Sequence, residues 1–552
     1  MRFLFVLPWC LLVFFSSAAI AFDVSTKEEI CSYIGKSFAN DPPPARVSWE
    51  ACPSYPPSQT CTGPSCLSGG VCRGANRHLD SAACVGAACC RAGSVSSGNR
   101  VNVEAYLNRV VSNAAPDSSV DDAPGIAEAV ECASSLSATE RTVYFPAGKY
   151  LVRTPIRPNY SNMAFTGPDV SAAALQSGAA ASYATIRVEP CNPEQFPGAF
   201  QLSDLRRADG SYITTSASGV KIQNFKIELT NGPRGGTSNS GIQLNRCTNC
   251  LVQDIWMKYD ETVGGARMCK PSNLDGITFA LGSGGSISDS VLDGIPKAGI
   301  YVNTIEALYG APPVTVENNE VKNTSGPFGG VGVGIVSPNV TLRNNNIHHN
   351  GYATVDSAGT WHYKGAGMYI VTAPETLGSV PNPANIGLYD NLLHHNYGTG
   401  LLIGSQAPQH RPSNIAITDL RTYANLGHGM SVEAGTNIAV TKLRSWGNGY
   451  FGLTLTSKTT FPAGSLRVDG VTFTDTFIVE NTLEPNWTSA RPSVWLQAGG
   501  VSINGGKAIR CTSDSEQRQG VVQYSWTQGV SPNQVSYVPT NNSVTNFDIS
   551  GL

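Results

Sequence analysis

Short segments in which apolar and polar residues alternate recur along the second half of the chain. Alternation with a period of two predicts strands, because successive side chains of a strand point to opposite faces. Each segment is followed, directly or after a loop, by a Gly-apolar-x-apolar stretch such as GMYI or GLLI. Stacked copies of this unit predict a solenoid. The segments are LVQDIWMKYD (251–260), SISDSVLDGI (286–295), VTVENNEVKNT (314–324), VTLRNNNIHHN (340–350), IGLYDNLLHHN (386–396), IAITDLRTYAN (415–425) and IAVTKLRSWGN (438–448).

The spacing of the segments favours a parallel coil over a sandwich of antiparallel sheets. The tightest interval, 23 residues from Asn425 to Asn448, has room for three short strands and three turns. An antiparallel sandwich would instead need hairpin signals such as Asn-Gly between paired runs, and few occur here at regular spacing. We therefore predict an all-β solenoid of parallel strands.

The stretch VDDAPGIAEAVECASSLSATERTVYFPAGKYLVRTPI (120–156) lies ahead of these segments. It resembles the opening of the pectate lyase/polygalacturonase superfamily, and the Asn-rich segments resemble the parallel β-helix repeats of that superfamily. The resemblance implies a right-handed parallel β-helix over about 100–480 with an N-terminal capping helix. We read 481–552 as a C-terminal β cap. Fold alone does not settle function.

The N-terminus predicts export. Residues 1–21 combine Arg2, a long apolar run and Ala19-Ile20-Ala21, the pattern of a signal peptide. Eight cysteines fall within 22–95, which in an oxidising compartment predicts a small disulfide-rich module. The CTNC at 247–250 is expected to form a disulfide or a turn, with a zinc half-site as the alternative. We expect a secreted protein.

Charge and composition indicate which classes of binding partner to expect. The formal net charge is −3 and no basic run occurs, which argues against a nucleic-acid partner. No stretch after the signal approaches the length of a membrane span, so no membrane partner is expected. Charged residues make up 14% and Gly numbers 57, which suits a turn-rich β protein. We expect a monomer that binds a polysaccharide.

The overlay of the segments predicts which side chains face outward. The position of Ile347 is held mostly by apolar residues, so the residue after it faces solvent. The next position, that of His349 and His395, lies near a turn and is expected to be structural. The asparagines that follow are expected to form a hydrogen-bonded stack of amides: Asn350, Asn396, Asn425 and Asn448. The outward column is Lys258, Asp293, Lys322, His348, His394, Tyr423 and Trp446.

A second outward set comes from the strand after each turn. A long insertion, 351–366, precedes one of these strands, and long loops on a rigid scaffold often carry binding residues. Seven of the eight histidines lie within 348–428, which indicates a functional patch. The insertion contributes Asp356, His362, Tyr363 and Lys364. The second set is Thr278, Tyr301, Val336, Tyr369, Leu402, Ser431 and Thr454.

These residue types suit proton transfer on a uronate polymer. Removing the proton next to a carboxylate needs a cation, a base and an acid, and histidine titrates close to neutral pH. The candidate catalytic residues are His348, His394, Lys364, Tyr423, His362 and Tyr363. The candidate substrate-binding residues are Lys258, Lys322, Tyr301, Tyr369, Asp356 and His428. We assign no metal ligands and no cofactor; calcium, or a transition metal held by histidines, is a further possibility.

Several functions could use these candidate residues. Lyase and C5-epimerase chemistry cannot be separated on these residues. Polygalacturonase-type hydrolases carry NTD, DD and GHG motifs ahead of the Gly-apolar strand, and this chain has NLDGI (273–277) and GHGM (427–430). Asp275 and His428 are five copies apart, about 24 Å, whereas paired carboxylates must lie about 5–10 Å apart. A non-catalytic glycan-binding protein is the remaining alternative.

Overall fold

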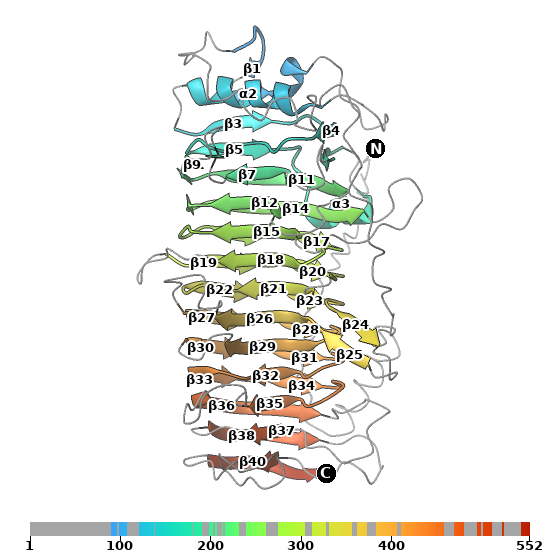
Figure 1. Cartoon of the computed structure of the whole chain (residues 1–552), viewed down its shortest axis with the longest axis vertical. Helices are drawn as coiled ribbons and strands as arrows, with labels where there is room; N and C mark the ends of the chain where they lie inside the picture. The colour runs from blue at the N-terminus through green and yellow to red at the C-terminus, as the bar shows by residue number, and fades with distance from the viewer. Residues whose placement is uncertain are drawn as a thin grey trace, which may run out of the picture.

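The computed structural model shows coils stacked along one long axis, with the N-terminal coils at one end and the C-terminal coils at the other (Figure 1). The predicted signal peptide, nearly all of the predicted cysteine-rich module, and Asp356 lie outside the described residues. The described residues are 90–96, 99–107, 121–136, 139–179, 182–189, 198–202, 205–206, 212–213, 216–230, 239–260, 274–303, 312–326, 330–355, 361–372, 382–405, 410–456, 468–479, 494–497, 501–509, 521–523 and 543–551.

One coil consists of β22 (Val340–Arg343), β23 (Asn346–His348) and β26 (Ala366–Thr372). Among the described residues, β22 and β23 belong to a 23-stranded sheet, here sheet 1, and β26 belongs to an 11-stranded sheet, here sheet 2. Each strand pairs in parallel with the equivalent strand of the next coil, as β23 does with β28 (Leu392–His394). The predicted parallel solenoid is therefore confirmed.

The remaining strands repeat this plan, except that the first strand of sheet 1 pairs antiparallel with its neighbour. Sheet 2 also contains β7 (Phe200–Leu202), β12 (Asn239–Asn245), β15 (Leu274–Ala280), β18 (Ala298–Asn303), β21 (Val331–Ile335), β29 (Thr399–Ser405), β32 (Met430–Val432), β35 (Leu453–Thr456), β37 (Val494–Gln497) and β39 (Val521–Gln523). Sheet 1 also contains β1 (Val95–Ser96), β2 (Arg100–Asn102), β3 (Arg141–Tyr144), β4 (Gly148–Val152), β5 (Met163–Thr166), β6 (Ala184–Val188), β11 (Lys221–Thr230), β14 (Leu251–Asp260), β16 (Ser286–Ser288), β17 (Val291–Asp293), β19 (Val314–Glu317), β20 (Glu320–Lys322), β27 (Ala384–Tyr389), β30 (Ser413–Thr418), β31 (Arg421–Tyr423), β33 (Gly435–Thr441), β34 (Arg444–Trp446), β36 (Val468–Val479), β38 (Val501–Ile509) and β40 (Ser543–Gly551).

Smaller pairings and helices complete the described chain. Three further pairs are β8 (Leu205–Arg206) with β9 (Tyr212–Ile213), β10 (Ala217–Ser218) with β13 (Cys247–Thr248), and β24 (Tyr352–Val355) with β25 (Trp361–Lys364). The helical segments are η2 (Val103–Tyr106), α2 (Ala123–Ser135) and α3 (Ala172–Ser177). Within the described part of the chain, no helix combines the length and apolarity that crossing a membrane requires.

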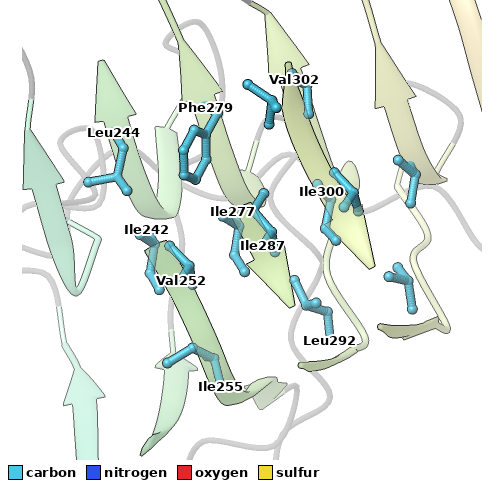
Figure 2. Close-up of a cluster of buried hydrophobic side chains, with 14 of the residues drawn as sticks. Ile242, Leu244, Val252, Ile255, Ile277, Phe279, Ile287, Leu292, Ile300 and Val302 are labelled. Atoms are coloured by element: carbon cyan, nitrogen blue, oxygen red, sulfur yellow. The ribbon is translucent and has the colours of Figure 1, made fainter. Parts of the chain in front are cut away.

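The core is a column of aliphatic side chains between the two sheets. Ile242, Ile277 and Ile300 stand in register on successive coils of sheet 2 and are fully buried. Figure 2 shows them facing residues such as Val252 and Leu292 of sheet 1. Each such side chain contributes about 1.5–3 kcal/mol when removed from water, so the alternating pattern fixes which face of every strand turns inward.

The predicted asparagine stack is confirmed. Asn350 Nδ2 donates to Asn396 Oδ1 at 3.0 Å, and Asn396 Nδ2 donates to Asn425 Oδ1 at 2.8 Å. Asn425 continues the ladder to Asn448 at 2.9 Å. All four amides are completely buried, so their hydrogen bonds to one another and to the turn backbone satisfy groups that water cannot reach.

A second asparagine ladder lies one turn earlier in each coil and was not singled out from the sequence. Asn319 Nδ2 donates to Asn345 Oδ1 at 3.0 Å, and Asn345 Nδ2 donates to Asn391 Oδ1 at 2.9 Å. These amides also bond the backbone, as in the 2.9 Å contact from Asn345 Nδ2 to the carbonyl of Val316. Two corners of the described coils are therefore fixed by amide ladders.

The N-terminal end carries α2, which lies above the first coils in Figure 1. The sequence predicts a helix at this place, and Cys132 of α2 forms a disulfide with Cys90. Its role as a cap stays a prediction. The disulfide between Cys247 and Cys250 confirms the first of the two structures expected for CTNC.

The coil continues beyond residue 480, in the range that the sequence predicted as a C-terminal β cap. β38 pairs in parallel with β36, and β40 pairs in parallel with β38. In sheet 2, β37 and β39 extend the stack from β35 in the same way. The described strands after residue 480 are therefore further turns of the same two sheets.

One register differs from the predicted overlay. Gly334, and not Val336, stands between Tyr301 and Tyr369 in the outward column of sheet 2. The stretch VGVGIV contains two glycines, and the coil uses Gly332 as the inward glycine that begins the strand. The sequence pattern alone fits either glycine, and the hydrogen-bonding register decides between them.

Candidate functional site

The first predicted outward column is an unbroken ladder on sheet 1. Strand pairing places His348 beside His394, His394 beside Tyr423, and Tyr423 beside Trp446. The ring centroids of the two histidines are 4.8 Å apart and their planes differ by 10°. The next two steps are 4.7 Å each, with planes 6° and 8° apart. The register predicted from the sequence is confirmed, and in-register stacking follows from the spacing of the strands.

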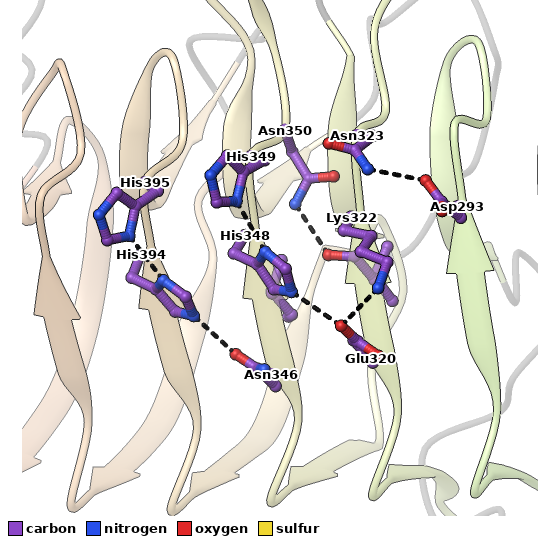
Figure 3. Close-up of polar contacts among 12 residues, drawn as sticks. Asp293, Glu320, Lys322, Asn323, Asn346, His348, His349, Asn350, His394 and His395 are labelled. Atoms are coloured by element: carbon purple, nitrogen blue, oxygen red, sulfur yellow. Dashed lines mark hydrogen bonds and ion pairs between the residues drawn. The ribbon is translucent and has the colours of Figure 1, made fainter. Parts of the chain in front are cut away.

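Both nitrogens of each histidine have protein partners (Figure 3). His348 Nε2 lies 3.1 Å from Glu320 Oε1, and because a carboxylate only accepts, the ring donates. His394 Nε2 donates to Asn346 Oδ1 at 2.9 Å. The Nδ1 atoms of both rings lie 2.7 Å from Nδ1 of the next residue, His349 or His395. A proton can therefore pass from these rings to a substrate only if one of these bonds breaks.

Little of the ladder meets solvent. The exposed fraction is 6% for His394, which stacks between His348 and Tyr423, and 2% for Trp446, which stacks on Tyr423. Burial lowers the pKa of His394 well below its ordinary value, and the three neighbouring imidazoles lower it further. The prediction that this column faces solvent is wrong at these two positions, although the side chains do point away from the core.

The histidines that follow are turn residues. His349 has a φ of 56° and His395 a φ of 52°, which is the left-handed region that histidine adopts more readily than most residues. Their rings stack on each other with centroids 5.2 Å apart. This geometry agrees with the structural role predicted for them.

The predicted cations of sheet 1 lie in the same column. Lys322 Nζ is 2.8 Å from Glu320 Oε1, the oxygen that also accepts from His348. Burial by itself would raise the pKa of Glu320, but these two hydrogen bonds outweigh it and lower the pKa to about 2. Lys258 is exposed and stands in register between Glu228 and Asp293. The column is thus a row of alternating charges, Glu228, Lys258, Asp293 and Lys322, that leads into the aromatic ladder.

The predicted insertion forms a hairpin. Tyr352–Val355 pairs antiparallel with Trp361–Lys364, which leads directly into β26. Lys364 is exposed, with Nζ 5.9 Å from the centre of the Tyr352 ring. His362 and Tyr363 lie on the second strand of the hairpin, but their side chains lie outside the described part of the structure. Their catalytic roles stay predictions.

A second group lies on the outward face of sheet 2. Tyr301 on β18 and Tyr369 on β26 flank Gly334 of β21. Lys297, which immediately precedes β18, places Nζ 3.1 Å from Asp275 Oδ2 and 5.2 Å from the centre of the Tyr301 ring. We call Asp275, Lys297, Tyr301 and Tyr369 the lysine–tyrosine cluster. It combines a cation, a carboxylate and two phenols at one place on the outer surface.

The electrostatics of this cluster keep its phenols protonated. Burial raises the pKa of Tyr301 above its ordinary value, and the negative charge of Asp275 raises it further. Burial likewise raises the pKa of Tyr369, and both Tyr301 and Asp275 add to the effect. The side chain of Asp275 is 1% exposed, whereas that of Lys297 is 24% exposed. The ammonium group can therefore meet a ligand while the carboxylate holds it from below.

Sequence reasoning found the two tyrosines of this cluster but missed its ion pair. Lys297 lies one residue outside the overlaid strands, in the turn before AGIYV, and Asp275 was set aside with the hydrolase motif. The available signal was the lysine immediately ahead of the strand that carries an outward tyrosine. Its partner, 22 residues earlier, becomes a neighbour only through the coil.

The hydrolase pattern is interrupted in the structure as predicted. Asp275 stands beside Ser240 in register, and five coils, about 24 Å, separate it from His428. The ring of His428 stacks on Phe451 at 5.4 Å and accepts the Phe451 N–H at 3.3 Å through Nδ1. The positions between Asp275 and His428 hold Ala298, Val331, Ala366 and Thr399, none of which is a carboxylate.

The histidines and carboxylates of this surface are the residue types that could bind a metal ion. No group of three or more His, Cys, Asp or Glu side chains in the described ranges is arranged to hold a metal ion. The four ladder and turn histidines point their Nδ1 atoms at one another, which directs those lone pairs into hydrogen bonds. The described residues therefore give no site for the calcium or transition metal considered from the sequence.

Two protein-family models match the sequence of this chain. Residues 107–356 match a model described as rhamnogalacturonase A/epimerase, pectate lyase-like, and residues 275–473 match a right-handed β-helix region. Comparison with curated protein sequences gives no match. The chain belongs to the pectate lyase-like superfamily of right-handed β-helix proteins.

Solved structures of similar shape include two epimerase modules. The A-module of mannuronan C-5 epimerase AlgE6 from Azotobacter vinelandii is 14% identical, with 81% of this chain and 99% of that chain covered and a TM-score of 0.48. The AlgE4 A-module from the same organism is 14% identical, with 82% and 96% covered and a TM-score of 0.41. A tailspike protein of E. coli bacteriophage HK620 in complex with a hexasaccharide is 12% identical, with 82% and 80% covered and a TM-score of 0.49.

Proposed function

We propose that the protein is an exported enzyme that acts on a uronate-containing polysaccharide by moving the proton next to the carboxylate, as a lyase or a C5-epimerase. The observation that carries this proposal is the lysine–tyrosine cluster, in which Lys297 lies beside Tyr301 on the outer face of sheet 2. The family match to pectate lyase-like proteins is in keeping with it.

Lys297 is the group that would neutralise the uronate. A positive charge close to the carboxylate makes the neighbouring proton easier to remove, because the charge that develops in the transition state is stabilised. Asp275 holds the ammonium at 3.1 Å and so fixes its position. We assign Asp275 a positioning role, since its side chain is covered while that of Lys297 reaches the surface.

Tyr301 is the group that would donate a proton. Its raised pKa keeps the phenol protonated, which suits an acid and not a base. In a lyase the proton goes to the leaving oxygen of the glycosidic bond, and the chain is cut. In an epimerase it goes to the opposite face of the same carbon. For the base we propose His362, a candidate catalytic residue to which the sequence assigned no specific role, in the hairpin that leads into the strand of Tyr369.

The hypothesis of a glycoside hydrolase of the polygalacturonase type has less support. Hydrolysis by paired carboxylates requires a second acid within about 5–10 Å of the first. In its column, Asp275 has Ser240 on one side and Ala298 on the other. Neither can serve as that acid.

The test is to incubate the full chain with defined polyuronates. Ultraviolet absorbance from unsaturated ends would identify a lyase, and a changed anomeric NMR pattern without unsaturation would identify an epimerase. Lys297→Met and Tyr301→Phe should each lower turnover by about 10²-fold or more, the usual contribution of a positioned acid. The matched control is Lys442→Met, whose ammonium pairs with Asp419 on a different surface at 3.6 Å. Polysaccharide binding without either product would mean a glycan-binding protein.

A further inference from the structure

The outward column of sheet 2 contains a glycine where neighbouring coils carry side chains. Thr278, Tyr301 and Tyr369 stand in register with Gly334 between the two tyrosines. The φ of Gly334 lies outside the left-handed region, so its backbone would accept other residues. The fold therefore does not require glycine here for conformational reasons.

The two tyrosine rings account for the glycine. A Cβ atom on Gly334 would lie 3.0 Å from Tyr301 Cδ2 and 3.0 Å from Tyr369 Cζ. Both rings thus occupy the space above Gly334, from opposite sides. Gly367 differs, because a Cβ there would point inward and lie 2.7 Å from Asn396 Nδ2 of the amide ladder. Gly367 serves the scaffold, whereas Gly334 serves the outer surface.

We propose that Gly334 is a positioning residue of the active site: its missing side chain lets Tyr369 lie across one coil and cover Tyr301, which keeps the proton-donating phenol shielded from water. This inference rests on the proposed function for the role of Tyr301 as an acid. The geometric part, that both tyrosine rings reach over residue 334 only because it is glycine, stands on the distances at that position.

The groups that face Tyr301 determine the direction in which its pKa should change. Burial of the ring and the charge of Asp275 of β15 both favour the protonated phenol, whereas the nearby ammonium of Lys297 favours the ionised form. β21 contributes no titratable side chain, since its sequence is VGVGI. If a side chain at position 334 pushes Tyr369 aside, water reaches Tyr301 and the largest cause of its raised pKa weakens.

The experiment compares Gly334→Ala with a matched control on the other sheet. Gly387→Ala also adds a methyl group against a tyrosine, because its Cβ would lie 2.6 Å from Tyr389 Cε2. Ultraviolet titration should show one tyrosine ionising at lower pH in Gly334→Ala and no such change in Gly387→Ala. The shift should vanish when Tyr301→Phe is added. On the polyuronate substrate, kcat should fall about tenfold with KM little changed, and the alkaline limb of the rate profile should move to lower pH.

Tyr369→Ala provides a second route to the same exposure and does not add volume. It should shift the ionisation of Tyr301 in the same direction. Unchanged ionisation of Tyr301 in both variants would overturn the inference. A wild-type protein that is inactive on every polyuronate, with the shift present in Gly334→Ala, would overturn the proposed function and leave the positioning of Tyr301 supported.

Discussion

His348 and His394 are stacked in parallel on neighbouring coils, 4.8 Å apart, yet their Nε2 atoms have unlike partners. His348 donates to the carboxylate of Glu320, whereas His394 donates to the neutral amide of Asn346. Glu320 and Asn346 themselves stand in register. Protonation of the second imidazole therefore brings a positive charge to a buried ring whose Nε2 partner is a neutral amide, which separates two residues that look equivalent in the sequence.

Replacing His394 with alanine should destabilise the protein. The ring is buried between His348 and Tyr423, and its removal leaves a cavity and an unpaired amide, a loss of about 3 kcal/mol in the free energy of unfolding. Chemical denaturation measures it. Lys258→Ala, an exposed member of the same column, should change the value by less than about 0.5 kcal/mol. Equal stability of both variants would contradict the stacked role.

Acid should weaken the fold through His394. Its pKa in the folded protein lies well below the ordinary value of 6.5, so the unfolded chain binds the proton more readily. The stabilisation is complete above pH 6.5 and is lost as the pH falls below that value. His394→Phe keeps a stacked ring that cannot take up a proton. Its free energy of unfolding should drop less than that of the wild type between neutral pH and about pH 5.

Glu320 should affect the stability of the fold over a lower pH range than His394 does. Its folded pKa is lowered from 4.5 to about 2 by His348 and Lys322, so its contribution to stability is present above pH 4.5 and is lost as the pH falls toward 2. Glu320→Gln should therefore flatten the stability profile over that interval. Thermal unfolding at a series of pH values tests this, and an unchanged slope between pH 4.5 and 2 would show that the hydrogen bonds do not act as described.

Breaking the buried asparagine ladder should lower the free energy of unfolding more than breaking an exposed row of asparagines. Asn396→Ala removes the acceptor for the backbone and side-chain N–H groups of Asn350, both at 3.0 Å, with an expected loss of about 3 kcal/mol or more. Asn385 belongs to an exposed row, and glycine keeps its left-handed conformation. Asn385→Gly should cost less than about 1 kcal/mol in denaturant unfolding. A similar cost for both would remove the distinction between the two rows.

Much of the fold could be predicted because it depends on local pattern. Period-two alternation decides which face of each strand is buried, so the column of His348, His394 and Tyr423 was assigned correctly. The ladder of Asn350, Asn396, Asn425 and Asn448 could be predicted because asparagine repeats at one position of the overlay. The register of VGVGIV could not be predicted, because two glycines fit the pattern equally and only the hydrogen bonds to β18 and β26 choose between them.

The sequence by itself determined the parallel solenoid, its inward and outward faces, and the types of side chain on its surface, since these follow from short-range periodicity. The tertiary structure alone decided that the histidine ladder is covered, and that Lys297 meets Asp275 beneath Tyr301. The physical reason is that burial and ion pairing depend on which atoms stand one coil away. That distance is about 4.8 Å in space but more than twenty residues along the chain.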